Sequence, residues 1–488
     1  MTDLKRKTVA GILWSVARAG WSSAVTLVLF ILLARILEPE DFGLFALASI
    51  LIEVGRILSS GGIGDAVIRA QEPDDRFLST VFWLNISLSF AFAGLIAICA
   101  PLYDYFIGGA DSLEIIFALA LTLPLSSCGA VHGALLAREF SYAKLTLQAM
   151  MSGLSSGVIA ITLALSGFGV WSLVAQAFVS AIVSVVFAWV VTRWRPSLQF
   201  DTTVIRSIAA FGASLAVTQL VWMLLVRVQD LFIASFYGPG AVGLYRIAWR
   251  MIEIIANMLL GPMGGVSLVS FARMQSEPER RRHAYGKLIS YASFLVFPMI
   301  LGFGATAGLL MPLIFGKNWD EAVPVAQVLS LMVVPFVFNF FAGPALTSAN
   351  HAAEVLKVAM VQLLTTILFT WIAVPFGLVA VAVGYVLRAY LTMPLQQYML
   401  SRHLGIRMRD TWAAMALPLG CATTMAVAVH VSQSWLVAEI GTGWPSALMA
   451  VALGAAIYSA LVIVLAWTQL RDMVATLLSM RRDTEPHK

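Results

Sequence analysis

The stretch LARILEPEDFGLFALASILIEVGRILSSGGIGDAVIR, residues 33–69, decides the fold because its pattern returns 200 residues later in the chain. Phe45 then stands opposite Tyr245, and the positions that match identically are Pro39/Pro239, Gly43/Gly243, Leu44/Leu244, Ile52/Ile252 and Glu53/Glu253. Each copy is a proline turn that leads into an apolar helix. A match at a fixed offset indicates an internal duplication, so the sequence predicts two related halves.

Further matching groups continue this duplication in the same order along the chain. Pro101-Leu102, Pro124 and Ala134-Leu135 match Pro312-Leu313, Pro335 and Ala345-Leu346 at an offset of 211, and Phe168-Gly169 matches Phe376-Gly377 at 208. The offsets drift as small insertions would make them drift. Six helices per copy is an even number, so both copies enter the membrane from the same side. This predicts parallel repeats related by an axis along the membrane normal.

The composition excludes an ordinary soluble protein. Of 488 residues, 60% are hydrophobic and 12% are charged, and the mean hydropathy is +0.88. In soluble proteins about half of the residues are apolar and about a quarter are charged. The three cysteines have no paired spacing and the six histidines form no HxxxH or HExxH pattern, so no metal site is predicted. No phosphate-binding glycine loop occurs, which excludes an ATP-driven pump within this chain.

The first apolar run is long and contains Arg18, so we expect it to remain as a helix rather than be cleaved as a signal peptide.

Apolar runs of about 20 residues, the length that spans a bilayer, predict fourteen transmembrane helices. Their ranges are 9–36, 42–68, 77–101, 113–137, 143–166, 170–192, 206–236, 241–271, 286–311, 322–348, 354–374, 377–400, 411–431 and 445–469. Pro124, Pro262, Pro298, Pro335 and Pro344 lie inside these ranges. They are interpreted either as gating hinges or as the ordinary proline content of membrane helices.

The basic residues set the orientation. Twenty-three of the 31 lysines and arginines fall on one side of the fourteen-helix plan, whereas Lys317 is alone on the other. By the positive-inside rule both termini are cytoplasmic. The basic residues lie in short loops and not on a soluble face, so no nucleic-acid partner is expected. We therefore predict an all-α polytopic membrane protein with an N-terminal lobe (1–197, helices 1–6), a C-terminal lobe (198–404, helices 7–12), helices 13–14 (405–470) and a cytoplasmic tail (471–488).

Charged residues within the predicted helices are candidates for function, because each charge at the bilayer centre costs about 2.5–3.5 kcal/mol. Seven arginines and four carboxylates qualify: Arg18, Arg35, Arg56, Arg227, Arg246, Arg250 and Arg388, with Glu53, Asp65, Asp230 and Glu253. Spacing predicts structural pairs within single helices: Glu53 with Arg56, Asp230 with Arg227, and Glu253 with Arg250.

The excess of arginine favours a functional interpretation beside the structural one. Pairing cannot neutralise seven cations with four anions, and the planar guanidinium suits phosphate or carboxylate. The candidate residues for binding an anionic substrate are Arg18, Arg56, Arg246, Arg250 and Arg388, and the candidates for coupling to an ion are Glu53, Asp230 and Glu253. No cofactor is expected apart from a coupling ion, a proton or sodium.

The KRKTVAGILWSVAR opening (residues 5–18), the LARILEPEDFGLFALA start and the fourteen-helix plan together resemble the polysaccharide transporter family of the multidrug/oligosaccharidyl-lipid/polysaccharide flippase superfamily. Within it the chain is similar to bacterial O-antigen and exopolysaccharide flippases. The resemblance implies two six-helix lobes around a cavity that opens alternately to each side of the bacterial inner membrane. It also implies that relatives carry cavity arginines on helices 1, 2 and 8, where Arg18, Arg56, Arg246 and Arg250 stand here. Helices 13 and 14 resemble a pair that forms a lipid-tail groove.

The cargo implied by the resemblance is an undecaprenyl pyrophosphate-linked oligosaccharide repeat unit, moved from the cytoplasmic to the periplasmic leaflet for surface polysaccharide biosynthesis. Membrane lipids, a polysaccharide polymerase and glycosyltransferases are the expected partners, and no enzymatic activity is expected. Two alternatives remain. A multidrug or cation antiporter of the same superfamily would need uncompensated carboxylates, whereas the interior has an arginine excess. A membrane polysaccharide polymerase or ligase would need a larger outer domain than these short loops provide.

Overall fold

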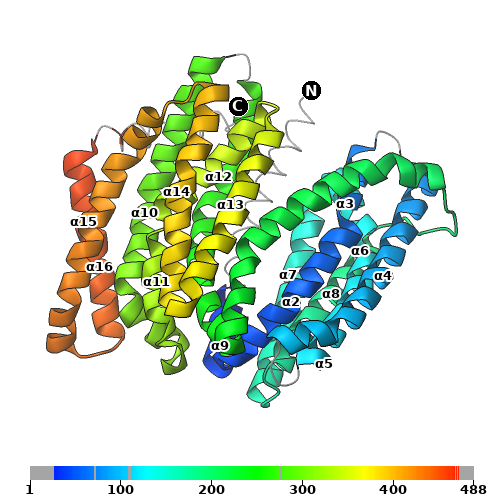
Figure 1. The fold of residues 1–488 in the computed structure, drawn as a ribbon, viewed down its shortest axis with the longest axis horizontal. Helices are drawn as coiled ribbons and strands as arrows, with labels where there is room; N and C mark the ends of the chain where they lie inside the picture. Colours follow the sequence, from blue (N-terminus) through cyan, green and yellow to red (C-terminus); the bar gives the residue numbers. More distant parts are fainter. Residues whose placement is uncertain are drawn as a thin grey trace, which may run out of the picture. The chain divides into compact units, whose positions relative to one another are not determined.

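The structure, a computed structural model, describes residues 27–467 apart from 71–72, 108–111 and 275–276, together with 469 and 471. These residues are predominantly helical, and no strand occurs among them (Figure 1). The helices are α2 (Pro39–Ser60), α3 (Ile63–Arg69), α4 (Asp75–Ile107), α5 (Ser112–Ala120), α6 (Thr122–Arg138), α7 (Tyr142–Leu165), α8 (Trp171–Val191), α9 (Thr202–Arg273), α10 (Pro278–Phe315), η1 (Lys317–Trp319), α11 (Ala322–Ser330), α12 (Val333–Ser348), α13 (Ala352–Ala373), η2 (Val374–Phe376), α14 (Leu378–Leu404), α15 (Met408–Ile440) and α16 (Trp444–Leu465).

The predicted class, an all-helical multi-pass membrane protein, is confirmed. Within the described residues, 11 helices are long and apolar enough to span a membrane, or 12 when the bent pair α11–α12 counts as one span. The 72-residue α9 is far longer than one crossing needs, and a short apolar helix at Leu27–Ile36 covers the described end of predicted helix 1. The structure is therefore compatible with fourteen helices.

The long α9 contains the turn that the sequence places between predicted helices 7 and 8. Gly238 has φ 78° and ψ 179°, which is not a helical conformation. Its positive φ is a region that side chains with a Cβ rarely adopt. Two hydrogen-bonded pairs, Gln229 with Tyr245 and Asp230 with Arg246, join residues 16 apart across this point. A straight helix would separate such residues by about 24 Å, so the chain folds back at Gly238.

Irregularities of the backbone recur at the spacing of the duplication. Phe140 and Asn350, the two non-glycine residues with positive φ in the described part, are 210 residues apart, and each lies two residues beyond a helix. Gly169 and Gly377, which match in sequence, also both have positive φ. These repeated irregularities are features that an internal duplication predicts.

Two helix breaks likewise occur at matching prolines. The α5–α6 break precedes Pro124, and α11–α12, bent by 56°, breaks just before Pro335. In each case the proline is the third residue of the second helix, where its missing N–H leaves no intrahelical bond unmade. By contrast, helices continue through Pro298 and Pro344. The prolines in the breaks therefore differ from those tolerated inside spans.

Matching residues of the two copies also contact one another. α2 begins at Pro39, and the side chain of Asp41 accepts a hydrogen bond from the Glu38 N–H at 3.1 Å. A Cβ added to Gly43 would overlap the carbonyl oxygen of Pro239, and a Cβ added to Gly243 would overlap that of Pro39. The contact is thus reciprocal, as at a two-fold axis. Glycine at both positions lets the two helix starts touch through their backbones.

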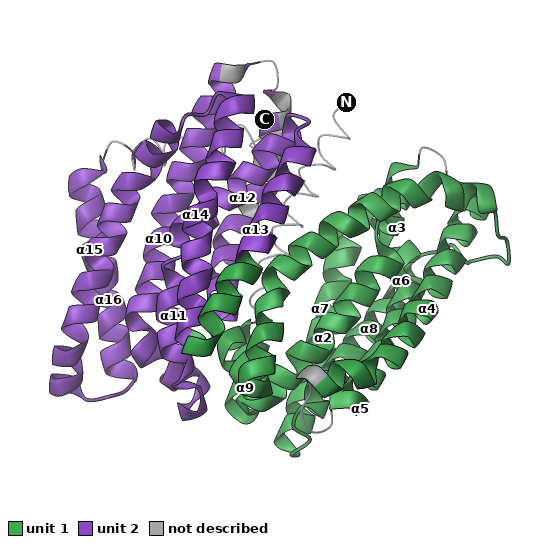
Figure 2. Ribbon diagram, in the orientation of Figure 1, with its two compact units in different colours: residues 1–247, 366–378 green, residues 248–365, 379–488 purple. Residues whose placement is uncertain are grey.

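The helices are grouped into two compact units (Figure 2). Unit 1 comprises residues 1–247 and 366–378, and unit 2 comprises residues 248–365 and 379–488. In unit 1, α2, α4, α5 and α8 share a core that includes Leu44, Ile96 and Val174. In unit 2, α10 packs against α12 and α15, and α15 packs against α16. Compactness is a different criterion from duplication, and the predicted lobe limits at 197 and 404 stay a prediction.

Candidate functional site

The predicted intramembrane charges fall into two groups, one in each unit. In unit 1, five of them form what we call the interior ion network: Glu53, Arg56, Arg227, Asp230 and Arg246. In unit 2 lie Arg250, Glu253 and Arg388. Arg18 lies outside the described residues.

Asp230 is the buried centre of the interior ion network, since its side chain is 0% exposed. Arg246 Nε donates to Asp230 Oδ2 at 2.7 Å, and the terminal Nη2 of Arg246 donates to the same oxygen. The turn at Gly238 produces this contact because it brings the two arms of α9 together. Asp230 Oδ1 is also buried, and it has no hydrogen-bond partner among the described residues. One carboxylate oxygen is thus bound by arginine while the other remains available.

Glu53 connects α2 to α9 through a second arginine. Arg227 donates to Glu53 Oε2 from Nε at 3.2 Å and from Nη2 at 3.1 Å. The two residues are 174 positions apart in sequence, and α2 and α9 belong to the two halves that the duplication predicts. This charge-assisted contact therefore joins a helix of the first copy to a helix of the second.

The pairs predicted within single helices are present but longer. Arg227 Nη1 lies 3.8 Å from Asp230 Oδ2, and Arg56 Nη2 lies 3.8 Å from Glu53 Oε1. The shorter bonds cross between helices, and the sequence reasoning missed them because i,i+3 spacing reports only neighbours on one helix. Arg56 has a 64% exposed side chain, which leaves it accessible.

The charges of the interior ion network do not cancel. Three guanidinium groups face two carboxylates, so the network has one excess positive charge. Charges in a low-dielectric interior interact strongly and need partners. The surplus favours an anion as the ligand of these arginines.

In unit 2, the predicted pair of Arg250 and Glu253 is confirmed. Arg250 Nη1 donates to Glu253 Oε2 at 2.7 Å, and both side chains are more than one-third exposed. Exposed pairs of this kind contribute little to stability, about 0–1 kcal/mol. Both groups can therefore exchange partners with little loss of stability.

Arg388 on α14 is the second notable group of unit 2. The residue is 3% exposed, and it makes no ion pair with any carboxylate in the described part of the chain. Its guanidinium carbon lies 4.3 Å from the centre of the Tyr385 ring, and Trp249 packs edge-on against that ring at 5.4 Å. A cation above an aromatic face gains about 0.5–2 kcal/mol, which offsets only part of its desolvation.

The aromatic partner of Arg388 was not singled out from the sequence, although Tyr385 stands at i−3 on the same helix. Arg388 Nε is buried and has no hydrogen-bond partner among the described residues. A planar donor of this type binds phosphate or carboxylate oxygens in a bidentate fashion. The arrangement is chemically suited to an anionic group and contains no catalytic nucleophile with its base.

Three comparisons place the chain among known proteins. A family model described as "Polysaccharide biosynthesis protein" matches residues 32–324, more than half of the chain. The succinoglycan biosynthesis transport protein ExoT of Rhizobium meliloti (strain 1021) is 27% identical over 97% of this chain and 95% of its own length. The lipopolysaccharide biosynthesis protein WzxC of Escherichia coli (strain K12) is 26% identical over 68% of each.

Solved structures show the same fold. The lipid II flippase MurJ in an inward closed conformation superposes with a TM-score of 0.76 at 12% identity, covering 95% of this chain and all of its own. An inward-facing multidrug resistance MATE family transporter of the MOP superfamily gives 0.57 at 18% identity, covering 82% of this chain and 94% of its own. At these identities the comparison establishes the fold alone.

Proposed function

We propose, from the premise that the chain belongs to the polysaccharide biosynthesis protein family, that it flips an undecaprenyl pyrophosphate-linked oligosaccharide across the bacterial inner membrane. The movement runs from the cytoplasmic to the periplasmic leaflet by alternating access, with both termini cytoplasmic. The relative that matches almost the full chain is named a succinoglycan biosynthesis transport protein. The fold shared with a lipid II flippase supports the same class of cargo.

The observation that carries the proposal is Arg388, a buried arginine without a carboxylate partner in the described residues, together with the surplus of arginine over carboxylate in the interior ion network. The interior ion network has one excess positive charge, and Arg388 is buried without a counter-charge in the described residues. A pyrophosphate supplies the missing negative charge and several acceptor oxygens. Arg18, Arg56, Arg246, Arg250 and Arg388 remain the proposed substrate-binding set.

The physical chemistry of the cargo fits this arrangement. Each desolvated polar group of a sugar or pyrophosphate costs several kcal/mol in hydrocarbon, whereas a polyprenyl tail is soluble there. A transporter therefore has to shield the head and can leave the tail in lipid. Helices α15 and α16, whose exposed side chains include Val431, Leu448 and Val464, are the proposed surface for that tail.

Coupling to an ion gradient is assigned to Asp230 ahead of Glu53 and Glu253. Asp230 Oδ1 is buried without a partner among the described residues, while Glu53 and Glu253 each hold a close arginine. A proton or sodium ion at Oδ1 would weaken the hold of Asp230 on Arg246. The cation released from that pair would then be available to the pyrophosphate. In the proposed pathway, glycosyltransferases supply the lipid-linked unit and a polymerase consumes it.

The proposal is tested with Arg388→Gln in the full-length protein. Loss of a charge-assisted hydrogen bond, worth about 1.5–3 kcal/mol, should lower transport about ten- to hundredfold. The measurement is the movement of a lipid-linked oligosaccharide between leaflets of proteoliposomes, together with surface polysaccharide in cells. Arg402→Gln, an exposed arginine on the same helix, is the matched control and should transport normally.

Two results would contradict the proposal. The first is normal flipping by Arg388→Gln, which would remove the buried cation from the substrate site. The second is gradient-driven export of a cationic dye by proteoliposomes that do not move the lipid-linked oligosaccharide. That outcome would favour the antiporter function instead.

A further inference from the structure

A polar pocket lies at one end of unit 2. Its lining contains none of the predicted intramembrane charges. It has a volume of about 390 Å³ and is lined by residues from the first turns of α10, the start of α15 and the segment after α16. The lining includes His283, Lys287, Tyr291, Asp410 and Gln469. Nothing in the transport proposal uses these residues.

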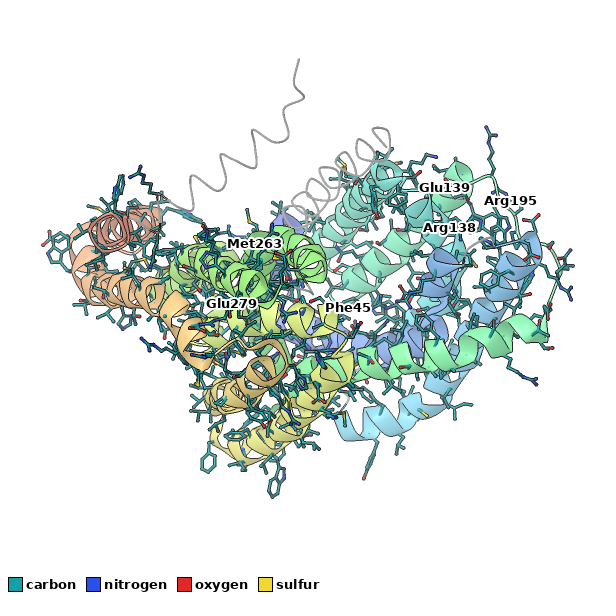
Figure 3. All side chains as sticks on the ribbon, turned by 90° about the horizontal axis from the view of Figure 1, so that it is seen from above. Phe45, Arg138, Glu139, Arg195, Met263 and Glu279 are labelled. Atoms are coloured by element: carbon teal, nitrogen blue, oxygen red, sulfur yellow. The ribbon has the colours of Figure 1, made fainter. Side chains whose placement is uncertain are left out.

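One wall of the pocket is fixed by an ion pair. Arg282 Nε donates to Asp410 Oδ2 at 2.9 Å and so links α10 to α15. Glu279, labelled in Figure 3, lies 3.8 Å from Arg282 at the rim, with a side chain that is 87% exposed. The carboxylates of the lining, Glu279 and Asp410, thus both face Arg282, and Lys287 makes no ion pair with either.

A second part of the lining is a row of side chains along α10, the helix that also carries Glu279 and Arg282. His283, Lys287 and Tyr291 follow each other at intervals of four residues, so they lie one above another on the helix. His283 and Lys287 are exposed and make no ion pair with a described carboxylate. Gly286 lies in the same wall, and a Cβ added there would meet nothing within 4 Å. The pocket is therefore open beside one available cation, Lys287, and the exposed imidazole of His283.

Beyond Tyr291 the same ridge of residues at four-residue steps, which winds around α10, becomes apolar. Leu295 and Met299 are the next residues at four-residue steps, and they are 44% and 54% exposed. α10 is 38 residues long, well beyond the roughly 20 that cross the hydrocarbon core. The charged first turns of α10 are the end expected at headgroup level, which would put the exposed leucine and methionine at acyl-chain depth.

We infer that this pocket binds an anionic phospholipid of the cytoplasmic leaflet. The phosphate is held by Lys287 and His283, the hydroxyls of Ser290 and Tyr291 contact the glycerol, and the acyl chains lie along Leu295 and Met299. The exposed arginines Arg280, Arg407 and Arg409, which are close in sequence to the lining residues, put the pocket on the side where the positive-inside rule places the basic loops. A bound lipid of this kind would stabilise the α10–α15 contact.

The test uses purified full-length protein in phosphatidylcholine nanodiscs with increasing phosphatidylglycerol. Retention of phosphatidylglycerol is measured by native mass spectrometry. Lys287→Gln should weaken binding about fivefold, the equivalent of about 1 kcal/mol for one cation near the surface. Lys144→Gln removes an exposed charge from α7 outside the pocket and should leave binding unchanged.

Gly286→Leu is a second variant that blocks the pocket without removing charge. The added side chain enters open space, and leucine is a better helix former than glycine. Thermal unfolding without lipid should therefore be unchanged or higher, while phosphatidylglycerol retention should fall to the level of phosphatidylcholine. Equal retention by wild type, Lys287→Gln and Gly286→Leu would overturn the inference. So would equal affinity for phosphatidylcholine, or displacement of phosphatidylglycerol by a polyprenyl diphosphate at lower concentration, which would assign the pocket to cargo.

Discussion

The interior ion network of unit 1 and Arg388 of unit 2 differ in how a buried charge is stabilised. Asp230 is fully buried with its bonds to Arg246 from the other arm of α9, and Glu53 holds Arg227 across helices. Arg388 has an aromatic ring and no described carboxylate. Partnered charges fix how helices meet. A buried charge without such a partner stabilises little, and Arg388 is therefore the residue proposed above for contact with the pyrophosphate.

The largest effect is expected when a partnered charge is removed. Asp230→Asn leaves Arg246 buried without its anion, and breaking a buried pair costs about 3–5 kcal/mol. Thermal unfolding in detergent should show the loss as a lower midpoint and reduced folded yield. The double variant Asp230→Asn/Arg246→Met removes both charges and should recover most of the stability, because an apolar replacement of the pair is often neutral.

That double variant also separates coupling from folding. If Asp230 carries the coupling ion, the residual transport of the recovered protein should no longer respond to an imposed proton or sodium gradient in proteoliposomes, whereas that of Arg246→Met, which loses only the proposed substrate-binding arginine, should still respond. A recovered protein that keeps its gradient dependence would reduce Asp230 to a structural role. Failure of the double variant to regain stability would show that the network is not an independent pair.

An intermediate effect is expected where the two copies touch without charge. Gly43→Ala places a methyl group against the Pro239 carbonyl, and overpacking of this kind costs about 1–3 kcal/mol. Gly243→Ala should cost a similar amount, because its contact with Pro39 is reciprocal. Gly240→Ala meets nothing within 4 Å and should not destabilise the protein. Equal midpoints for Gly43→Ala and Gly240→Ala would contradict the close contact.

The smallest change in stability is expected at the unpartnered charge. Arg388→Met keeps the apolar contact with Tyr385 and removes the desolvated cation, so the free energy of unfolding should hold or rise slightly. Transport should fall as in Arg388→Gln. A clear loss of stability would show that the cation–aromatic contact is structural, and the contrast with Asp230 would then disappear.

Several features could be predicted from residues alone because they depend on local chemistry. The apolar runs predicted the helices, and the glycine-proline segment at 238–239 marked the turn inside α9. The pair of Arg250 and Glu253 followed from i,i+3 spacing. The positions of the duplicated prolines matched real helix breaks at Pro124 and Pro335.

Other features could not be predicted because they join residues far apart in the chain. Nothing in the spacing of Glu53 and Arg227 indicates that they bond across 174 residues. Helix 2 was predicted as one run, whereas α2 ends at Ser60 and α3 begins at Ile63. Gly62 lies between them with φ 78°, and a Cβ there would approach the Gly212 backbone. That break depends on a neighbouring helix as well as on the glycine.

The sequence by itself determined that this protein crosses the membrane many times and that it contains an internal duplication. It also determined that arginines outnumber carboxylates within the predicted membrane-spanning helices. Those properties depend on composition and on spacing along the chain. The hydrophobic effect and the free-energy cost of placing a charge in the membrane act on them whatever the tertiary packing is. Only the tertiary structure decided which charges are neutralised. Partner choice depends on which helix faces come within hydrogen-bonding distance, about 3 Å, and packing between distant segments sets that distance. This packing pairs Asp230 with Arg246, and it places Arg388 against the ring of Tyr385.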